Sequence, residues 1–217
     1  VIELKSDYIS LPSGMLQEWP VGSPITLHTL ASLMISISDN TATNALLDVV
    51  GRERIEAYTM LNHPFLTTRE AFILKDPANS SLLGEYRQGD VEQRRSVLEK
   101  LEQLELPSPS IFAEPVALDV EWFFSVSELA GLMAYVQDLP MMSINPGIAS
   151  PASWQHIAYK GGSEPGVLNL TTRLVSSSGA NYFVSATWNH DEVLDETKFF
   201  SLYSGLLREL EKIDAGE

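Results

Sequence analysis

Apolar residues recur at steps of three and four on both sides of position 39, which predicts two consecutive amphipathic helices. The short polar triplet Ser38-Asp39-Asn40 separates them, and Gly51 is placed to end the second helix. Such residues disfavour helix interiors because their side chains compete for backbone groups. The triplet therefore either presents a hydroxyl and an amide from a rigid mount or is a plain turn in which Asp39 or Asn40 caps the next helix. The apolar positions are Leu27, Leu30, Leu33, Met34 and Ile37, then Ala42, Ala45, Leu46, Val49 and Val50.

A second pattern, near the C-terminus, is typical of a β-hairpin. The runs 168–175 and 182–188 are rich in β-branched and aromatic residues, and a turn containing Ser178-Gly179 joins them. Lys160-Gly161-Gly162 lies at the end of a preceding strand. Two glycines after a lysine let a substrate lie against bare backbone, with a cationic amine beside it.

Between these patterns the chain reads mainly as helices. Residues 52–61 continue the helical region, 62–77 look less regular, and 78–106 look like a serine-rich turn followed by one charged helix, an accessory lid or packing element. Ser125-x-x-Glu128 is a capping box that opens another helix, and Asp195 or Thr197 can cap the last one. The residues expected to pack that last helix on the sheet are Phe199, Leu202, Leu206, Leu210 and Ile213.

The chain resembles the penicillin-recognising serine hydrolases, the superfamily of class A β-lactamases and penicillin-binding proteins. Three elements line one cleft in that family: a Ser-x-x-Lys motif, a Ser-Asp-Asn loop and a Lys-Thr-Gly strand. Ser38-Asp39-Asn40 matches the second element, and Lys160-Gly161-Gly162 matches the third with Gly in place of Thr. The resemblance implies an α+β fold, with a mostly helical subdomain at 1–150 and antiparallel strands with a C-terminal helix at 151–217.

The nucleophile motif of that family does not occur in these 217 residues. No lysine has a serine three positions before it; the residues found there are Ile2, Phe72, Val97, Ile157, Asp195 and Glu209. We therefore expect the native protein to extend upstream of Val1, with the nucleophile helix and the first strands of the sheet in that extension. Alone, this chain is expected to be nearly inactive.

The resemblance implies acyl transfer without a cofactor. An upstream serine would attack a carbonyl, Ser38 would relay a proton to the leaving group, and Asn40 would hold the substrate amide. Lys160 would keep the local potential positive, beside a substrate-binding strand edge formed by Gly161, Gly162 and Ser163. The backbone N–H of Ser163 would be half of the oxyanion hole.

Glu70 is the nearest carboxylate to the position at which class A β-lactamases carry their deacylating base. Its neighbours do not match the Glu-x-x-Leu-Asn pattern of that loop. An ordinary salt-bridged residue is the better interpretation of Glu70 than a general base. Without that base, efficient β-lactam hydrolysis is not expected.

The net charge and residue composition argue against several classes of binding partner and metal site. A net charge of −15 argues against nucleic acid or an anionic membrane surface as a partner. No cysteine is present, so thiol nucleophiles and thiolate metal sites are excluded, and the four histidines have no ligand spacing. The acidic residues at 191–196 are better explained as capping charges than as a metal site. The sequence contains no run of about 18 apolar residues, the length that a membrane-spanning helix needs.

The leading hypothesis is a β-lactamase-like serine hydrolase acting on a β-lactam, peptide or ester carbonyl, with a small-molecule substrate that can carry a carboxylate. An esterase or a D-alanyl carboxypeptidase on the same fold is the alternative within enzymes, and a non-catalytic binding module is the alternative outside them. A periplasmic or extracellular location is suggested by the resemblance alone. Self-association is expected through an uncovered sheet edge beside Lys160.

Overall fold

The computed structural model describes residues 1–216, which divide by compactness into two units, Val1–Phe124 and Ser125 onward. The fold is α+β: unit 1 is mainly helical, and unit 2 holds a three-stranded antiparallel sheet with its helices. The subdomain boundary expected at residue 150 stays a prediction; the compact units divide after Phe124 because helix α7 (Val126–Val136) contacts strand β5 (Asn181–Asn189).

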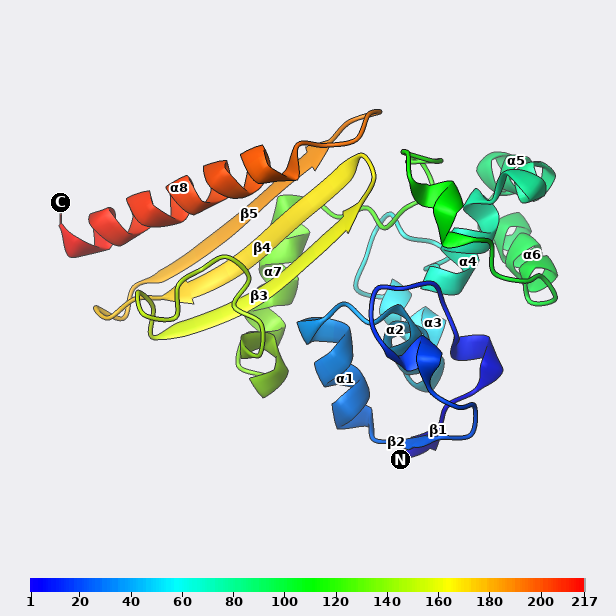
Figure 1. The fold of residues 1–217 in the computed structure, drawn as a ribbon, viewed down its shortest axis with the longest axis horizontal. Coiled ribbons are helices and arrows are strands. Elements are labelled where there is room, and N and C mark those ends of the chain that lie inside the picture. Colours follow the sequence, from blue (N-terminus) through cyan, green and yellow to red (C-terminus); the bar gives the residue numbers. More distant parts are fainter. Residues whose placement is uncertain (217) are drawn as a thin grey trace. The chain divides into compact units, whose positions relative to one another are not determined.

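The two helices predicted around Ser38 form the first core of unit 1. Helix α1 (Leu27–Ser36) and helix α2 (Asn40–Val50) contact each other, and Figure 1 shows them beside the short strands β1 (Ile2–Glu3) and β2 (Pro24–Ile25). Two short 3-10 turns, Ser6–Tyr8 and Leu16–Glu18, complete this part. The core consists of the buried residues Leu4, Tyr8, Leu16, Ile25, Leu30, Ala42 and Ala45.

The segment after Gly51 is more helical than its sequence pattern suggests. Helix α3 (Arg52–Glu56) is shorter than expected, but helix α4 (Thr68–Lys75) occupies a segment that we predicted to be irregular. Thr67 and Glu70 form a capping box that opens α4. The segment predicted as one charged helix contains two, α5 (Ser80–Gln88) and α6 (Val91–Leu101), because Asp90 caps α6 after a break at Gly89.

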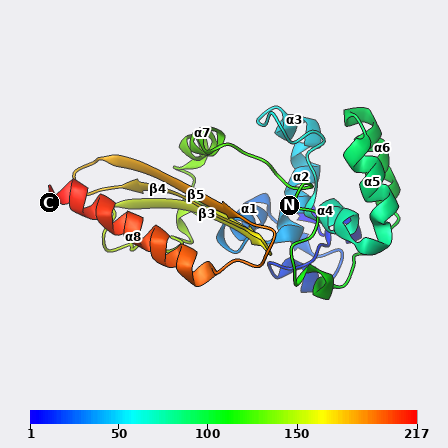
Figure 2. The ribbon, with the colours of Figure 1, turned by 90° about the horizontal axis from the view of Figure 1, so that it is seen from above.

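Helices α4, α5 and α6 enclose a hydrophobic core of their own. Figure 2 shows α5 and α6 side by side. The core includes Leu66, Ile73, Leu74, Leu83, Tyr86, Val97, Leu98, Leu101 and Val120. An ion pair between the buried Lys75 and Glu121 ties α4 to the irregular chain before unit 2. This part of the chain is therefore a packed element, as one of the two sequence interpretations expected.

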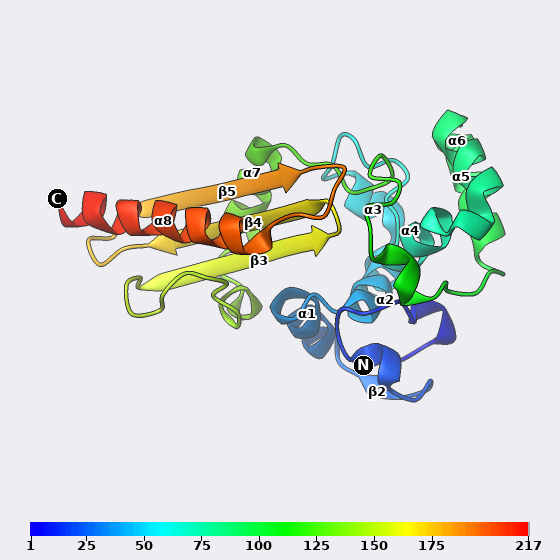
Figure 3. The same cartoon turned by 45° about the horizontal axis from the view of Figure 1, so that its top comes forward.

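Unit 2 is built on the predicted hairpin. Strands β3 (His156–Glu164), β4 (Val167–Val175) and β5 pair antiparallel in the order β3-β4-β5, as Figure 3 shows. Helix α8 (Glu196–Ala215) covers one face of the sheet, and α7 lies on the opposite side (Figure 2). Ser125 and Glu128 form the predicted capping box of α7, and Asp195 caps α8.

The apolar face predicted for α8 is partly wrong. Phe199 is buried as expected, but Leu202, Leu206 and Ile213 are 65%, 46% and 62% exposed. Tyr203 and Leu207 face the sheet instead. The phenol of Tyr203 donates to Thr172 Oγ1 at 2.9 Å and lies 3.0 Å from the carbonyl oxygen of Val184, so a polar anchor fixes which side of the helix turns inward.

Within residues 1–216, no helix combines the length and hydropathy needed to cross a bilayer. In the same residues, no three His, Asp or Glu side chains gather where they could hold a metal ion.

Candidate active site

The Ser-Asp-Asn triplet forms a rigid corner between α1 and α2, and its central carboxylate holds it in place. Asp39 is fully buried and caps α2: its Oδ1 accepts from the backbone N–H of Ala42 at 2.8 Å. Its Oδ2 accepts from the N–H groups of Met15 at 2.7 Å and Leu16 at 3.0 Å. The predicted cap at Asp39 is therefore confirmed, and the same carboxylate also anchors the loop before the corner.

Ser38 adopts a left-handed backbone conformation, with φ of 53°. Non-glycine residues rarely take this conformation, and it is concentrated at functional sites where the surroundings enforce it. The hydroxyl of Ser13 donates to the carbonyl oxygen of Ser38 at 2.6 Å, which helps to enforce it here. Ser38 is half-buried.

The loop of residues 10–16 wraps the corner. The side-chain amide of Asn40 donates to the carbonyl of Leu11 at 2.9 Å, and its backbone N–H donates to the carbonyl of Ser13 at 3.1 Å. Gly14 has φ of +106° and lies so close to Asp39 that a Cβ would stand 2.6 Å from the Cα of Asp39. Only glycine meets both conditions, so this loop and the corner form one unit.

A buried network of polar side chains connects the first turns of α2, next to the corner, to the start of α4. Asn44, on α2, accepts at Oδ1 from the backbone N–H and the hydroxyl of Thr68, both at 2.9 Å. The hydroxyl of Thr68 also lies 2.8 Å from Ser10 Oγ and 3.2 Å from the carbonyl of Asn40. Thr68 thereby joins the start of α4 to the first turn of α2. Sequence analysis missed Asn44 and Thr68 as parts of the site.

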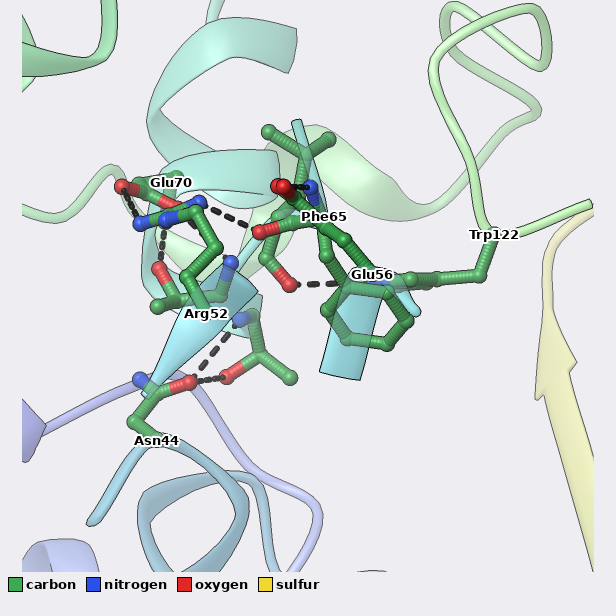
Figure 4. A network of polar contacts seen from close by, with 9 residues as sticks. Asn44, Arg52, Glu56, Phe65, Glu70 and Trp122 are labelled. Atoms are coloured by element: carbon green, nitrogen blue, oxygen red, sulfur yellow. Dashed lines mark hydrogen bonds and ion pairs between the residues drawn. The ribbon is translucent and has the colours of Figure 1, made fainter. Parts of the chain in front are cut away.

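Glu70 is a structural residue, in agreement with the preferred sequence interpretation. Its two carboxylate oxygens accept from Arg52, at 2.7 and 3.1 Å, and Oε2 also accepts from the N–H of Thr67 at 2.7 Å. Figure 4 shows this pair, with Arg52 also donating to the carbonyl of Phe65. Both carboxylate oxygens are therefore occupied by donors of the protein itself.

The same network contains a second buried carboxylate, Glu56, which the sequence pattern did not reveal. Its Oε1 accepts from the N–H of Phe65 at 2.8 Å (Figure 4). Its Oε2 pairs with Arg95 at 2.5 Å. Glu56 therefore joins α3 to α6 and holds residue 65 in place.

Lys160 lies on β3, and its Nζ donates to the carbonyl oxygen of Gly161. Burial lowers the pKa of Lys160 to about 8, because the ammonium is removed from water. In the register of the sheet, Lys160 faces Thr171, and Gly162 faces Asn169. Asn169, Thr171, Ser185 and Thr187 form a hydrogen-bonded polar patch on β4 and β5.

Gly161 and Gly162 have different surroundings. A Cβ at residue 161 would collide with the phenol oxygen of Tyr159 and stand 3.1 Å from the carbonyl of Asn169. At residue 162 a Cβ would meet nothing within 4 Å. The phenol of Tyr159 thus occupies the place of the side chain that the resembled family carries at position 161. Ser163 follows on the same strand and is exposed.

The predicted site residues fall in both units. Unit 1 brings Ser38 and Asn40 together on one corner, and unit 2 brings Lys160, Gly161, Gly162 and Ser163 together on one strand. A shared cleft between Ser38 and Lys160 stays a prediction.

Comparison with known proteins agrees with this geometry. Residues 1–106, which include the Ser-Asp-Asn corner, match the model of the beta-lactamase enzyme family. These residues are similar to that family. The predicted resemblance to the penicillin-recognising serine hydrolases is therefore confirmed, as is the predicted fold class. No curated protein matches.

Solved structures share the β-lactamase-like fold over nearly the whole chain. A beta-lactamase from Sphaerobacter thermophilus DSM 20745 is 20% identical, with a TM-score of 0.53, over 97% of this chain and 71% of that one. PBP-A is 17% identical, with a TM-score of 0.53 and the same coverage. A mutant of the class A beta-lactamase of the last common ancestor of Gram-negative bacteria gives a TM-score of 0.60 at 15% identity, over 98% and 74%.

Proposed function

We propose that this β-lactamase-like chain contributes its Ser-Asp-Asn corner and lysine strand to a serine hydrolase that forms an acyl-enzyme. The substrate would carry a β-lactam, peptide or ester carbonyl. The observation that carries the proposal is the corner itself: Ser38 has a positive φ directly before the fully buried cap Asp39, within residues 1–106, which match the beta-lactamase enzyme family. A plain interhelical turn needs neither feature.

Each predicted residue has a role in this proposal. Ser38 relays a proton between the lysine of the attacking Ser-x-x-Lys pair and the leaving group, and Asn40 holds the substrate amide. Lys160 supplies positive potential, and the N–H of Ser163 stabilises the oxyanion. Since no lysine of residues 1–217 follows a serine at the required spacing, the attacking Ser-x-x-Lys pair has to be supplied by residues outside this sequence.

Two features of the structure bear on which substrate group is bound and on how long the acyl-enzyme lasts. The Tyr159 hydroxyl beside Gly161 offers a hydrogen-bond donor to a substrate carboxylate, where the family usually has a threonine hydroxyl. Both oxygens of Glu70 are occupied, so the acyl-enzyme lacks this carboxylate as a deacylating base. We therefore propose a long-lived acyl-enzyme rather than rapid β-lactam hydrolysis.

The test uses the full-length protein. Incubation with a fluorescent penicillin, followed by mass spectrometry, should show one covalent adduct, with little turnover of a chromogenic cephalosporin. Ser38→Ala and Lys160→Ala should each slow acylation by about 10²-fold or more. Ser6→Ala and Lys212→Ala, at positions outside the corner and the strand, are the matched controls.

Other outcomes distinguish the alternatives. Turnover of a p-nitrophenyl ester without any penicillin adduct would replace the proposal by an esterase. The absence of any covalent adduct from a protein that binds penicillin reversibly would replace it by a binding module.

A further inference from the structure

Unit 1 contains a pocket of about 180 Å³ that none of the corner residues Ser38, Asp39 and Asn40 lines. It lies between the segment 61–66, α5, α6 and residues 119–123. Its apolar lining is Leu61, Pro64, Leu66, Tyr86, Val120 and Phe123. An apolar cavity of about 150 Å³ is large enough for benzene, so the pocket fits a body of one ring.

The charges in the lining do not cancel. Arg87 and Asp119 form a two-point ion pair, with distances of 2.7 and 2.5 Å, so together they are neutral. Glu121 pairs with Lys75. His63 lies 3.0 Å from the carbonyl of Thr59 and 3.9 Å from the carboxylate of Glu56.

Arg94 is the charge that remains. Among residues 1–216, no carboxylate forms an ion pair with its guanidinium; its Nε donates to the carbonyl of Tyr86 at 3.1 Å. The guanidinium carbon also stands 5.2 Å from the centroid of the Tyr86 ring. These contacts fix a half-buried cation at the pocket wall, and a fixed donor loses little entropy when it binds an anion.

We propose that this pocket binds a small monoanion with an apolar body, such as an aromatic monocarboxylate, with its carboxylate on Arg94. The apolar wall accepts the ring, and the single uncompensated guanidinium accepts one negative charge. The lining combines this apolar wall with polar side chains such as Asn62, so the pocket suits a ligand with an apolar body and a charged end. The site is independent of the proposed acyl transfer.

Benzoate, uncharged benzamide and cationic benzylamine are the probes. Each is titrated into the ¹⁵N-labelled protein, and the indole N–H signal of Trp122 is followed. Trp122 Nε1 donates to the carbonyl of Leu66, a lining residue, at 3.0 Å, so its signal reports the pocket. With four tryptophans in the chain, a Trp122→Phe variant assigns the signal. Benzoate should bind about tenfold more tightly than benzamide, and benzylamine should not bind.

Three variants locate the interaction. Arg94→Gln should weaken benzoate about tenfold and remove its advantage over benzamide, whereas Arg94→Lys should keep that advantage. Asp119→Asn frees Arg87 and should tighten benzoate about threefold, a gain that damage to the fold could not produce. Arg54→Gln removes a charge from an exposed position of the same unit and should change nothing.

Equal binding of benzoate and benzamide would overturn the proposal, and so would the absence of benzoate binding at about 50 mM, well beyond the weakest affinity expected for a specific site. A loss in Arg54→Gln equal to that in Arg94→Gln would show a general charge effect and would also overturn it.

Discussion

Two adjacent glycines on β3 show how the environment of a single residue decides what it tolerates. Gly161 has the Tyr159 phenol and a backbone carbonyl against it, whereas Gly162 is open. Neither adopts a left-handed conformation, so the difference between them is one of space alone. Their sequence context, Lys-Gly-Gly-Ser, gives no hint of that difference.

Gly161→Ala should destabilise the protein by about 1–3 kcal/mol, because the new methyl group forces Tyr159 out of its place. Gly162→Ala should be neutral or slightly stabilising, since alanine reduces the freedom of the unfolded chain. Chemical denaturation of both variants measures the difference. Tyr159→Ala combined with Gly161→Ala is the control, and it should remove most of the added cost of the alanine at 161. Equal stabilities of Gly161→Ala and Gly162→Ala would contradict the collision expected between a methyl group at residue 161 and the Tyr159 phenol.

Lys160 should make the stability of the protein depend on pH above neutrality. Its pKa is about 8 in the folded state, against 10.5 as the reference for the unfolded chain. Between these values the unfolded state binds more protons, so stability rises with pH, by at most about 1.4 kcal/mol per pH unit. Below pH 8 both states are protonated and the full penalty of burying the charge is present.

Lys160→Met removes the titrating ammonium and, with it, this pH-dependent contribution to the free energy of unfolding. We expect the Met variant to be the more stable protein at pH 7, and the difference to shrink as the pH rises from about 8 to about 10. Urea unfolding of both proteins at matched pH values measures it. A difference that stays constant over this range would show that Lys160 is not desolvated in the folded protein.

At the scale of elements, the residue that caps α2 stabilises both this helix and the loop before it. Its cap, Asp39, also satisfies two N–H groups of the loop before it. Asp39→Ala should therefore cost about 3–5 kcal/mol, because three N–H groups, two of them in buried hydrogen bonds, lose a charged acceptor. Thr26→Ala, at the exposed cap of α1, is the matched control and should cost about 1 kcal/mol.

Thermal and chemical denaturation of both variants measure these costs. Similar losses in Asp39→Ala and Thr26→Ala would mean that Asp39 acts as a cap only. A loss of the far-ultraviolet circular dichroism signal in Asp39→Ala beyond that of α2 would instead show that the whole unit depends on it.

Much of the fold was predictable because its elements have strong local signals. The steps of three and four around Ser38 predict α1 and α2, and the runs 168–175 and 182–188, rich in β-branched and aromatic residues, predict β4 and β5. Helix α4 was missed although Thr67-x-x-Glu70 is a capping box, because the apolar residues that follow, 71–74, form one unbroken run in which no helical period is visible. On α8 the predicted face was partly wrong, because Tyr203, an amphipathic residue, lies on the inward side with Phe199, while Leu202, Leu206 and Ile213 are exposed.

The candidate site was predictable only in its motif residues. Ser38, Asn40 and Lys160 stand in recognisable short motifs. Asn44 and Thr68 act through contacts between segments 24 positions apart in the sequence, and no local pattern records such a contact. The same holds for Glu56, whose partners Phe65 and Arg95 lie in other elements.

At the scale of the whole molecule, β3 is an edge strand. Within residues 1–216 it pairs with β4 alone, so its outer N–H and C=O groups can pair with a second chain. We expect residues 1–217 to self-associate through this edge at high protein concentration. The net charge of −15 opposes association, so added salt should strengthen it.

Gly162→Asp adds a charge to this edge at a position with open space and should weaken self-association. Sedimentation at several concentrations measures the effect, and Gly84→Asp, also at an open position but in unit 1, is the control. Equal association of both variants would place the contact elsewhere.

The fit of Gly14 against Asp39 also has a consequence for recombination. A chimaera that takes residues 17–51 from this protein and the preceding segment from a relative would insert a foreign loop against the carboxylate. Unless the donor loop has a glycine at the matching place, its side chain would dislodge the aspartate and release the serine from its left-handed turn. Productive crossovers in this region should therefore lie before residue 10 or after Gly51.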